Sequence, residues 1–295
     1  MKAREEGFLL LSSTLGNPQR KVLTTSQLRT LALRVAAMDR PRSDRDLTPA
    51  DLAAIGYGPE MAERIVKLLD DTALLQHYLR QGKNVGCVPV TRVSQNYPEA
   101  LRRRLGLDSP GVLWAKGDLS MLEKPMVALV GSRDIVAPNR QFAAQAGVQA
   151  ARQGYALVSG NARGADRIAQ DACLAAGGQV ISIVADELAK QEARKNVLYL
   201  SEGGFDEDFS SVRALSRNRV IHALGEKVLV AQCSLGMGGT WSGTVRNLKE
   251  GWSPVFCFRD GSEAAIQLEQ LGAVGVDLQD LEKINELQPN TKSFL

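Results

Sequence analysis

The chain has 295 residues, of which 44% are hydrophobic and 23% charged, and its formal net charge is +3. This composition is typical of a soluble globular protein, and the length allows one large domain beside a smaller one. The weak positive charge excludes a uniformly basic surface, so a polyanion would have to be held by a local patch. No apolar run approaches the roughly 18 residues of a membrane span, and the first residues carry no clear cleavage signature. We therefore expect no membrane partner and a cytoplasmic location.

The cysteines and histidines give no indication of a metal site. The four cysteines are Cys87, Cys173, Cys233 and Cys257. They are scattered and form no C-x-x-C pair, so we expect small buried side chains in a reducing compartment. A zinc site would have to be assembled from dispersed residues, and none is expected.

Residues 1–80 are predicted to form a small helical domain, of the SAM or helix-hairpin-helix kind. Apolar residues recur at helical spacing over Thr25–Ala37 and again over Leu47–Leu79, with a loop expected at Pro41–Asp46. Within the second stretch, glycines at Gly56 and Gly58 allow a tight turn whose backbone N–H groups approach a phosphate. Such hairpins hold a nucleic-acid backbone without reading its sequence. The alternative is a plain helix pair in which glycine only ends a helix.

Residues 81–125 are predicted to be an irregular or weakly stranded connecting segment, residues 126–288 a second domain, and residues 289–295 a tail. In the second domain, strands of continuous Val, Ile and Leu character alternate with helices. This pattern predicts an α/β fold: an extended Rossmann-like parallel sheet with helices on both faces. The expected strands are Val127–Val130, Ala156–Ser159, Val180–Val184, Val197–Leu200, Val228–Ala231 and Val255–Phe258. The expected helices are Asn139–Gln153, Ala165–Ala176, Val212–Leu224, Thr240–Glu250, Glu263–Gln270 and a terminal one over Leu278–Leu287.

Three predicted strands run into polar loops that contain glycine. Gly131-Ser132-Arg133 follows the first strand, and Ser159–Asp166 (SGNARGAD) and Gly236–Thr244 (GMGGTWSGT) follow two others. In an open parallel sheet such loops gather at the carboxyl ends of the strands, where ligands bind. Free backbone N–H groups and the planar forks of Arg133 and Arg163 suit phosphate.

The second and third loops also have a purely structural interpretation. In the second loop, Asp166 caps the next helix and Arg163 is solvated. The third loop cradles phosphate or simply opens a helix, and Trp241 within it stacks on a base or packs under the loop. Arg217–Arg219, around Asn218, either tracks a phosphate backbone or pairs with the acidic stretch Asp206–Asp208.

Taken together, these motifs resemble the DprA (Smf) family of DNA-processing proteins. The resemblance runs from SQNYPEALRRRL (residues 94–105) and VLWAKGDLSML (112–122) through VALVGSR, GYALVSGNARGAD, LSEGG and RNRVIHAL to LGAVGVD, over about residues 50–280. It implies a Rossmann domain behind a small helical domain, and sequence-independent binding of single-stranded DNA by a homodimer. It also implies delivery of the strand to a RecA-type recombinase during natural transformation.

The expected DNA site combines this resemblance with the glycine-rich loop. Its members are Gly131, Ser132, Arg133, Ser159, Gly160, Arg163, Gly164, Arg217, Asn218, Arg219, Gly238, Gly239 and Thr240.

The chain departs from the family pattern around this site. Gln170 stands where the family usually has His, Ala165 where it has a bulky aliphatic residue, and Gln232 where an acid follows the fifth strand. The segment Ala185–Asn196 is shortened, and Ala214–Ser216 replaces a Phe-Pro-like pair. No winged-helix tail is expected after residue 290, so the chain is identified as a divergent member.

We expect no catalytic residue and no cofactor. The chain lacks a dinucleotide fingerprint and the G-K-[ST] ending of an NTP-binding loop. Related phosphoribohydrolases use a P-G-G-x-G-T loop followed by a catalytic Glu, whereas here Glu250 is the nearest acid. A hydrolase without that carboxylate lacks general acid–base help. The alternative to a DNA-binding protein is a nucleotide-binding or nucleotide-sensing Rossmann protein.

Overall fold

The structure, a computed structural model, describes residues 1–38 and 46–289. Nearly all of the loop expected at Pro41–Asp46 and of the tail expected at 289–295 therefore lies outside the described residues. Among the described residues, no helix is both long and apolar enough to span a bilayer.

The N-terminal part is helical, as its periodicity predicted. It contains α1 (Ala3–Ser12), α2 (Thr25–Ala36), α3 (Pro49–Ala54), α4 (Pro59–Asp70) and α5 (Thr72–Asn84). Helix α2 begins at a reciprocal cap, in which Thr24 and Gln27 each bond the other's backbone N–H through a side chain. Gly56, with φ +84°, turns the chain between α3 and α4. Its carbonyl accepts a hydrogen bond from Arg34 Nη1 (3.0 Å), so α2 covers this side of the turn.

The described residues form a nine-stranded sheet with the order β1-β2-β6-β5-β4-β3-β7-β8-β9. The strands are β1 (Val88–Thr91), β2 (Val112–Lys116), β3 (Met126–Val130), β4 (Ala156–Gly160), β5 (Gln179–Val184), β6 (Val197–Glu202), β7 (Lys227–Val230), β8 (Val255–Phe258) and β9 (Val274–Val276). From β6 to β9 all pairings are parallel, which confirms the predicted α/β fold with a largely parallel sheet.

The sheet begins earlier than predicted, because the segment 81–125 contributes two strands to it. β1 pairs antiparallel with β2, and β2 pairs antiparallel with β6. The four residues of β1 include Pro89, which an edge strand tolerates. β2 is buried from Val112 to Ala115, so it shows no alternation that would distinguish it as a strand.

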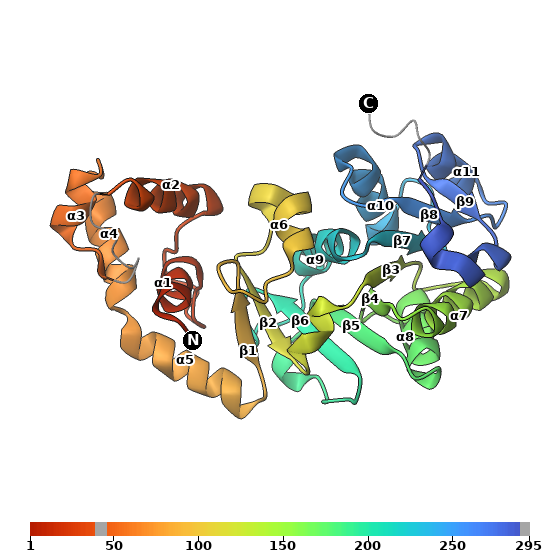
Figure 1. The fold of residues 1–295 in the computed structure, drawn as a ribbon, viewed down its shortest axis with the longest axis horizontal. Coiled ribbons are helices and arrows are strands. Elements are labelled where there is room, and N and C mark those ends of the chain that lie inside the picture. Colours follow the sequence, from red (N-terminus) through yellow and green to blue (C-terminus); the bar gives the residue numbers. More distant parts are fainter. Residues whose placement is uncertain (39–45, 290–295) are drawn as a thin grey trace.

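Helices cover both faces of the sheet (Figure 1). Val127 and Leu129 of β3 pack in the core with α7 (Ala137–Arg152) and α8 (Ala165–Ala175). The alternate residues Ala128 and Val130 point to the other face, toward α9 (Ser211–Leu224). The remaining helices are α6 (Glu99–Leu105), α10 (Gly238–Glu250) and α11 (Glu263–Gln270).

The predicted terminal α-helix is instead a 3-10 segment, Gln279–Glu286, with a kink at Lys283. The side chain of Gln153, the C-cap residue of α7, donates to the Leu281 carbonyl (2.8 Å) and accepts from the Ile284 N–H (2.7 Å). These bonds take backbone groups that a regular helix would pair internally. The strand β9 was also missed, since it has three residues and a central glycine.

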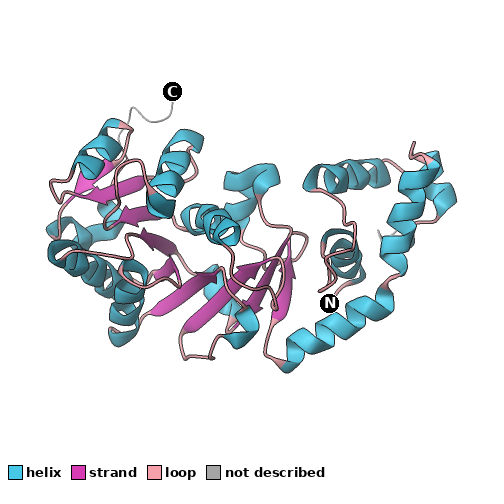
Figure 2. Ribbon diagram, turned by 180° about the vertical axis from the view of Figure 1, so that it is seen from behind, coloured by secondary structure: helices cyan, strands magenta, loops and turns pink. Residues whose placement is uncertain are grey.

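The N-terminal helices join the sheet through an aromatic cluster. Tyr78 of α5 contacts Trp114 of β2 and Phe205, with ring centroids 5.3 and 4.6 Å apart. The Tyr78 hydroxyl also donates to Asp206 (2.5 Å). Figure 2 shows α5 running from the other N-terminal helices to the near end of β1. The apolar contacts therefore continue from the helical part into the sheet.

Candidate nucleic-acid interface

A crevice of about 510 Å³ opens where the strand order reverses, between β3 and β7. Chain connections leave β3 toward β4 and leave β7 toward β8, and ligands bind at such a switch point. Eight of the expected site residues line this crevice: Gly131, Ser132, Arg133, Arg217, Asn218, Gly238, Gly239 and Thr240. The structure thus brings together all three glycine-containing loops, the second of them through Ala162 and Asp166, with the start of the RNR motif on α9.

The first turn of α10 forms one wall of the crevice. Met237, the N-cap residue, gives this helix no side-chain hydrogen bond, so the N–H groups of the first turn remain available for an anion. Thr240 Oγ1 donates to the Gly131 carbonyl (3.0 Å), and Asn218 Nδ2 donates to the Gly239 carbonyl (3.1 Å). These two side chains fix the position of the loop, and they leave its N–H groups unused.

Arg217 carries a buried positive charge at the base of the crevice. Its Nη1 donates to the Ile183 carbonyl (2.8 Å), while its Nε has no partner within the described structure. Burial lowers the pKa of Arg217 and raises the pKa of Asp166. The positive charge of Arg217 offsets part of the rise in the Asp166 pKa. Both groups lie against Gly160, where a Cβ would overlap the guanidinium and a carboxylate oxygen. Gly160 therefore makes room for this pair and is not itself part of the lining.

Arg133 and Arg163 differ in how they are held. Arg133 is exposed at the mouth of the crevice and has no hydrogen bond or ion pair to another described residue. Arg163 is also exposed but pairs with Asp134 (3.0 Å), and both side chains are open to solvent. Such a pair contributes little to stability. Arg133 is thus the more available of the two for a ligand, and Arg163 is not among the lining residues.

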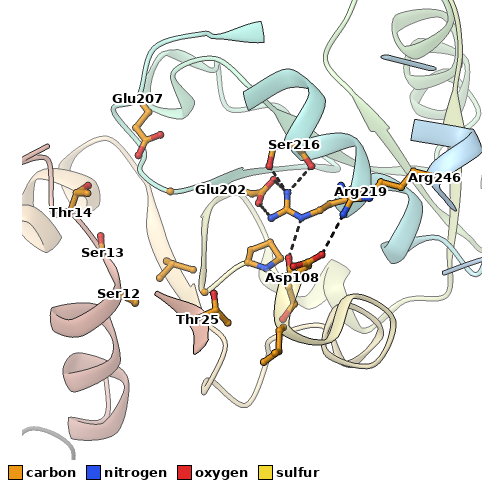
Figure 3. Close-up of a pocket in the computed structure, with 16 residues that line it drawn as sticks. Ser12, Ser13, Thr14, Thr25, Asp108, Glu202, Glu207, Ser216, Arg219 and Arg246 are labelled. Carbon is orange, nitrogen blue, oxygen red and sulfur yellow. Dashed lines mark hydrogen bonds and ion pairs between the residues drawn. The ribbon is translucent and has the colours of Figure 1, made fainter. Parts of the chain in front are cut away.

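Arg219 does not join the expected arginine cluster. It makes a bidentate ion pair with Glu202 (3.1 and 2.6 Å), and its Nε donates to the Asp108 carbonyl (3.1 Å). Figure 3 shows it in another cleft, of about 530 Å³, beside Ser216 and Arg246. Residues two apart on a helix point about 200° apart, so Arg217 and Arg219 leave α9 in different directions.

Ser159 and Gly164 also lie outside the crevice lining. Ser159 is fully buried, and its hydroxyl donates to the Leu129 carbonyl (2.9 Å), which ties β4 to β3. Gly164 has φ +82°, and a Cβ there would overlap the carbonyl oxygens of Ser132 and Arg133. The glycine lets α8 begin against the β3 loop, where the Ala165 N–H donates to Ser132 O (3.1 Å). Both residues therefore position the elements around the crevice without lining it.

The alternative given for the arginine motif, pairing with the acidic stretch Asp206–Asp208, applies to the neighbouring Arg213. This side chain bonds the carbonyls of Ala185, Glu207 and Asp208 (2.8 Å each) and pairs with Glu207 (3.2 Å). It therefore fixes the loop before α9. Trp241 is half-buried and packs against the core on the α9 side of the sheet, as its packing alternative predicted.

Sequence reasoning missed an apolar lip along the crevice. Phe209, Leu215 and Met237 line it and are 55%, 55% and 70% exposed. Val212 beside them is 77% exposed. In the sequence these residues looked like helix and loop core, so no signal separated them from packing residues. Exposed apolar side chains beside positive charge suit a ligand with both apolar and anionic parts.

His222, also missed, is buried at the back of the crevice. Asn247 Nδ2 lies 3.1 Å from its Nδ1 and also donates to the Ser253 carbonyl, so Nδ1 accepts and the proton is on Nε2. Nε2 has no partner in the described part of the chain. Burial lowers the pKa of His222 to about 4.

This depressed pKa predicts a loss of stability in mild acid. The unfolded chain takes up the proton near pH 6.5, before the folded chain does, so stability present above that pH is lost as the pH falls toward 4. At pH 5 the free energy of unfolding is expected to be about 2 kcal/mol lower than at pH 7 because of this residue. Urea unfolding at both pH values should show a smaller difference for His222→Leu. An unchanged difference would mean that His222 does not titrate in this window.

The profile of the family described as DNA recombination-mediator protein A matches residues 89–250, which is more than half of the chain. The chain belongs to this family. It is 32% identical over 171 residues to "DNA processing protein DprA" of Bacillus subtilis, covering 54% of this chain and 55% of that protein. It is 30% identical over 156 residues to "Protein Smf" of Escherichia coli, covering 49% of this chain and 41% of that one. The match thus spans about half the length of these curated relatives.

Solved structures agree with this family assignment. The DNA processing protein A of Streptococcus pneumoniae is 26% identical, with a TM-score of 0.72, over 98% of this chain and 99% of that one. A Helicobacter pylori DNA processing protein A has the same fold over 67% of this chain and 94% of that one, at 24% identity and a TM-score of 0.56.

Two departures from the family pattern have structural roles in this member. Gln170 donates to the Gly160 carbonyl and lies 3.4 Å from the Ser182 hydroxyl, so its amide fixes the end of β4. Gln232 accepts from the Val136 N–H (3.0 Å) and donates to Asp134 O (3.3 Å), which ties the β7 loop to the β3 loop. Both amides position crevice loops through backbone groups.

Proposed function

We propose that the switch-point crevice binds single-stranded DNA independently of sequence. The arrangement that carries the proposal is the convergence of Arg133, Arg217 and the uncapped start of α10 beside an apolar lip. Guanidinium groups and N–H donors suit phosphate oxygens, which are common to every sequence. The apolar side chains of Phe209, Leu215 and Met237 can contact the faces of unstacked bases. A single strand can present such faces, whereas a duplex keeps its bases stacked on one another. The H. pylori relative is described as having a single-stranded DNA binding mode, which supports the same assignment here.

We also propose that the protein binds its strand and does not cut it. Asp166, the acid in the crevice lining, is buried, and the positive charge of Arg217 stabilises its ionised form. A carboxylate in that position suits a fixed counter-charge better than a general acid or base, which needs contact with the reacting group. In this proposal the protein acts as a homodimer in the cytoplasm and passes its strand to a RecA-type recombinase during natural transformation.

Titrations with three matched ligands test the binding proposal. An oligothymidylate, a duplex and thymidine monophosphate would each be titrated across a range of salt concentrations. Tight, salt-sensitive binding of the single strand is expected, with weaker binding of the duplex.

The second candidate, a nucleotide sensor, is favoured by the crevice volume of about 510 Å³, which falls within the range of small-molecule pockets. Equal affinity for the mononucleotide and the oligonucleotide would support the sensor and contradict the DNA proposal.

A further inference from the structure

A separate apolar cleft of about 460 Å³ lies between the N-terminal helices and the segment 92–111. It shares no lining residue with the switch-point crevice. Its volume falls within the range of small-molecule pockets, about 300–1,000 Å³. Its apolar lining comes from Phe8, Leu11, Leu28, Leu31, Ala32, Val93 and Leu107.

One face of α1 and one face of α2 contribute to the cleft. On α2, Thr25, Leu28 and Ala32 lie three to four residues apart and therefore share a stripe. On α1, Phe8 and Leu11 are related in the same way. The deepest parts of both helices are in the core, where Leu11 and Leu31 are each 2% exposed. Of the apolar residues on these two helices that line the cleft, Phe8, Leu28 and Ala32 are the ones that the fold leaves partly or fully exposed.

Four arginines surround this apolar lining: Arg4, Arg29, Arg92 and Arg102. Arg92 is held by the Gly106 carbonyl (2.8 Å), and Arg102 by the Arg92 and Ser94 carbonyls and by Glu99 (2.9 Å).

The side chains of Arg4 and Arg29 are exposed and have no hydrogen bond or ion pair to another described residue. No Asp or Glu is among the described residues that line the cleft. The charge around the cleft is therefore positive, and an occupant should carry a negative group.

The mostly aliphatic lining indicates the chemistry of the part of the ligand that lies inside the cleft. A nucleobase placed here would bury its polar edges against aliphatic side chains, and a buried polar group without a partner costs stability. Phe8 is the aromatic residue of the described lining, so a stack of several bases has little support. An aliphatic chain needs no hydrogen bonds and fits leucine and alanine side chains directly.

We propose that this cleft binds a free amphipathic anion, with its aliphatic chain among the leucines and its carboxylate or similar head at the arginines. Arg4 and Arg29 are the two guanidinium groups available to pair with the head. Thr25, whose side chain also faces the cleft, offers a hydroxyl beside them. This site is independent of the DNA-binding proposal, because none of its residues lines the switch-point crevice.

Calorimetry with decanoate below its micelle concentration tests the proposal on the full chain. One decanoate is expected to bind per chain, and decyltrimethylammonium, which has the same chain length and the opposite charge, is not. The double change Arg4→Glu and Arg29→Glu should weaken decanoate binding by about tenfold or more, since two attractions become repulsions. Ala32→Trp should abolish binding by filling the cleft from an exposed helix position. Arg152→Glu, an exposed arginine at the end of α7, is the matched control and should leave binding unchanged.

Circular dichroism and thermal melting would establish that each variant folds. Equal binding of decyltrimethylammonium, or decanoate binding that Ala32→Trp leaves intact, would overturn the assignment. Binding to phosphatidylglycerol vesicles without binding to free decanoate would overturn it in favour of a membrane surface. Arg133→Ala should leave decanoate binding unchanged, which separates this site from the DNA crevice.

Discussion

Replacing Arg133 with alanine is expected to lower the affinity for single-stranded DNA by about tenfold to a hundredfold. Its guanidinium is exposed at the crevice mouth and has no partner among the described residues, so no internal bond has to break before it binds a phosphate. A hydrogen bond to a charged group contributes about 1.5–3 kcal/mol, which corresponds to that range of affinity. Removal of one phosphate contact on a single strand should also flatten the slope of log affinity against log salt by about 0.7. Fluorescence anisotropy across a salt series measures both quantities.

Other arginines supply the controls for this experiment. Arg152→Ala, on the far end of α7, should change neither affinity nor salt slope. Arg163→Ala should have a smaller effect than Arg133→Ala, because Arg163 must first leave Asp134. For Arg219, the bidentate pair with Glu202 predicts no change of slope. Equal losses from Arg133→Ala and Arg152→Ala would show that only the total charge matters and that the crevice is not the site.

The parallel part of the fold could be predicted from the sequence because its strands are buried on both faces. Val255–Phe258 was predicted and matches β8, since four consecutive apolar residues between turn signals leave little choice. The antiparallel strands could not be predicted in the same way. β2 pairs with β6, which lies more than eighty residues further along the chain, and no local pattern records such a partner.

The candidate site could be predicted at the level of loops but not of side chains. Strand–loop–helix order places Gly131–Arg133 and Gly238–Thr240 at one edge of the sheet, and these residues do meet there. Where each side chain points depends on neighbours that the sequence does not reveal. Arg219 is drawn to Glu202, and Ser159 turns into the sheet to bond Leu129.

Replacing Arg217 with methionine is expected to destabilise the protein by about 3–5 kcal/mol, because it would leave a buried charge without compensation. Arg217 is the main positive charge acting on Asp166, whose pKa burial already raises. Methionine keeps the apolar stem of the side chain but supplies neither that charge nor the bond to the Ile183 carbonyl. Urea unfolding at pH 7 measures the loss directly.

A second substitution separates the charge effect from the packing effect. Asp166→Asn in the Arg217→Met background should recover part of the lost stability, because a neutral amide needs no counter-charge. The deficit of Arg217→Met alone should also shrink in acid. Since the folded pKa of Asp166 is raised, the penalty is present above that pKa and is relieved as the pH falls through it and the carboxyl group becomes neutral. DNA affinity should stay low in the double variant, because the guanidinium is absent from the crevice. A double variant no more stable than Arg217→Met would show that Arg217 acts through packing and not through its charge on Asp166.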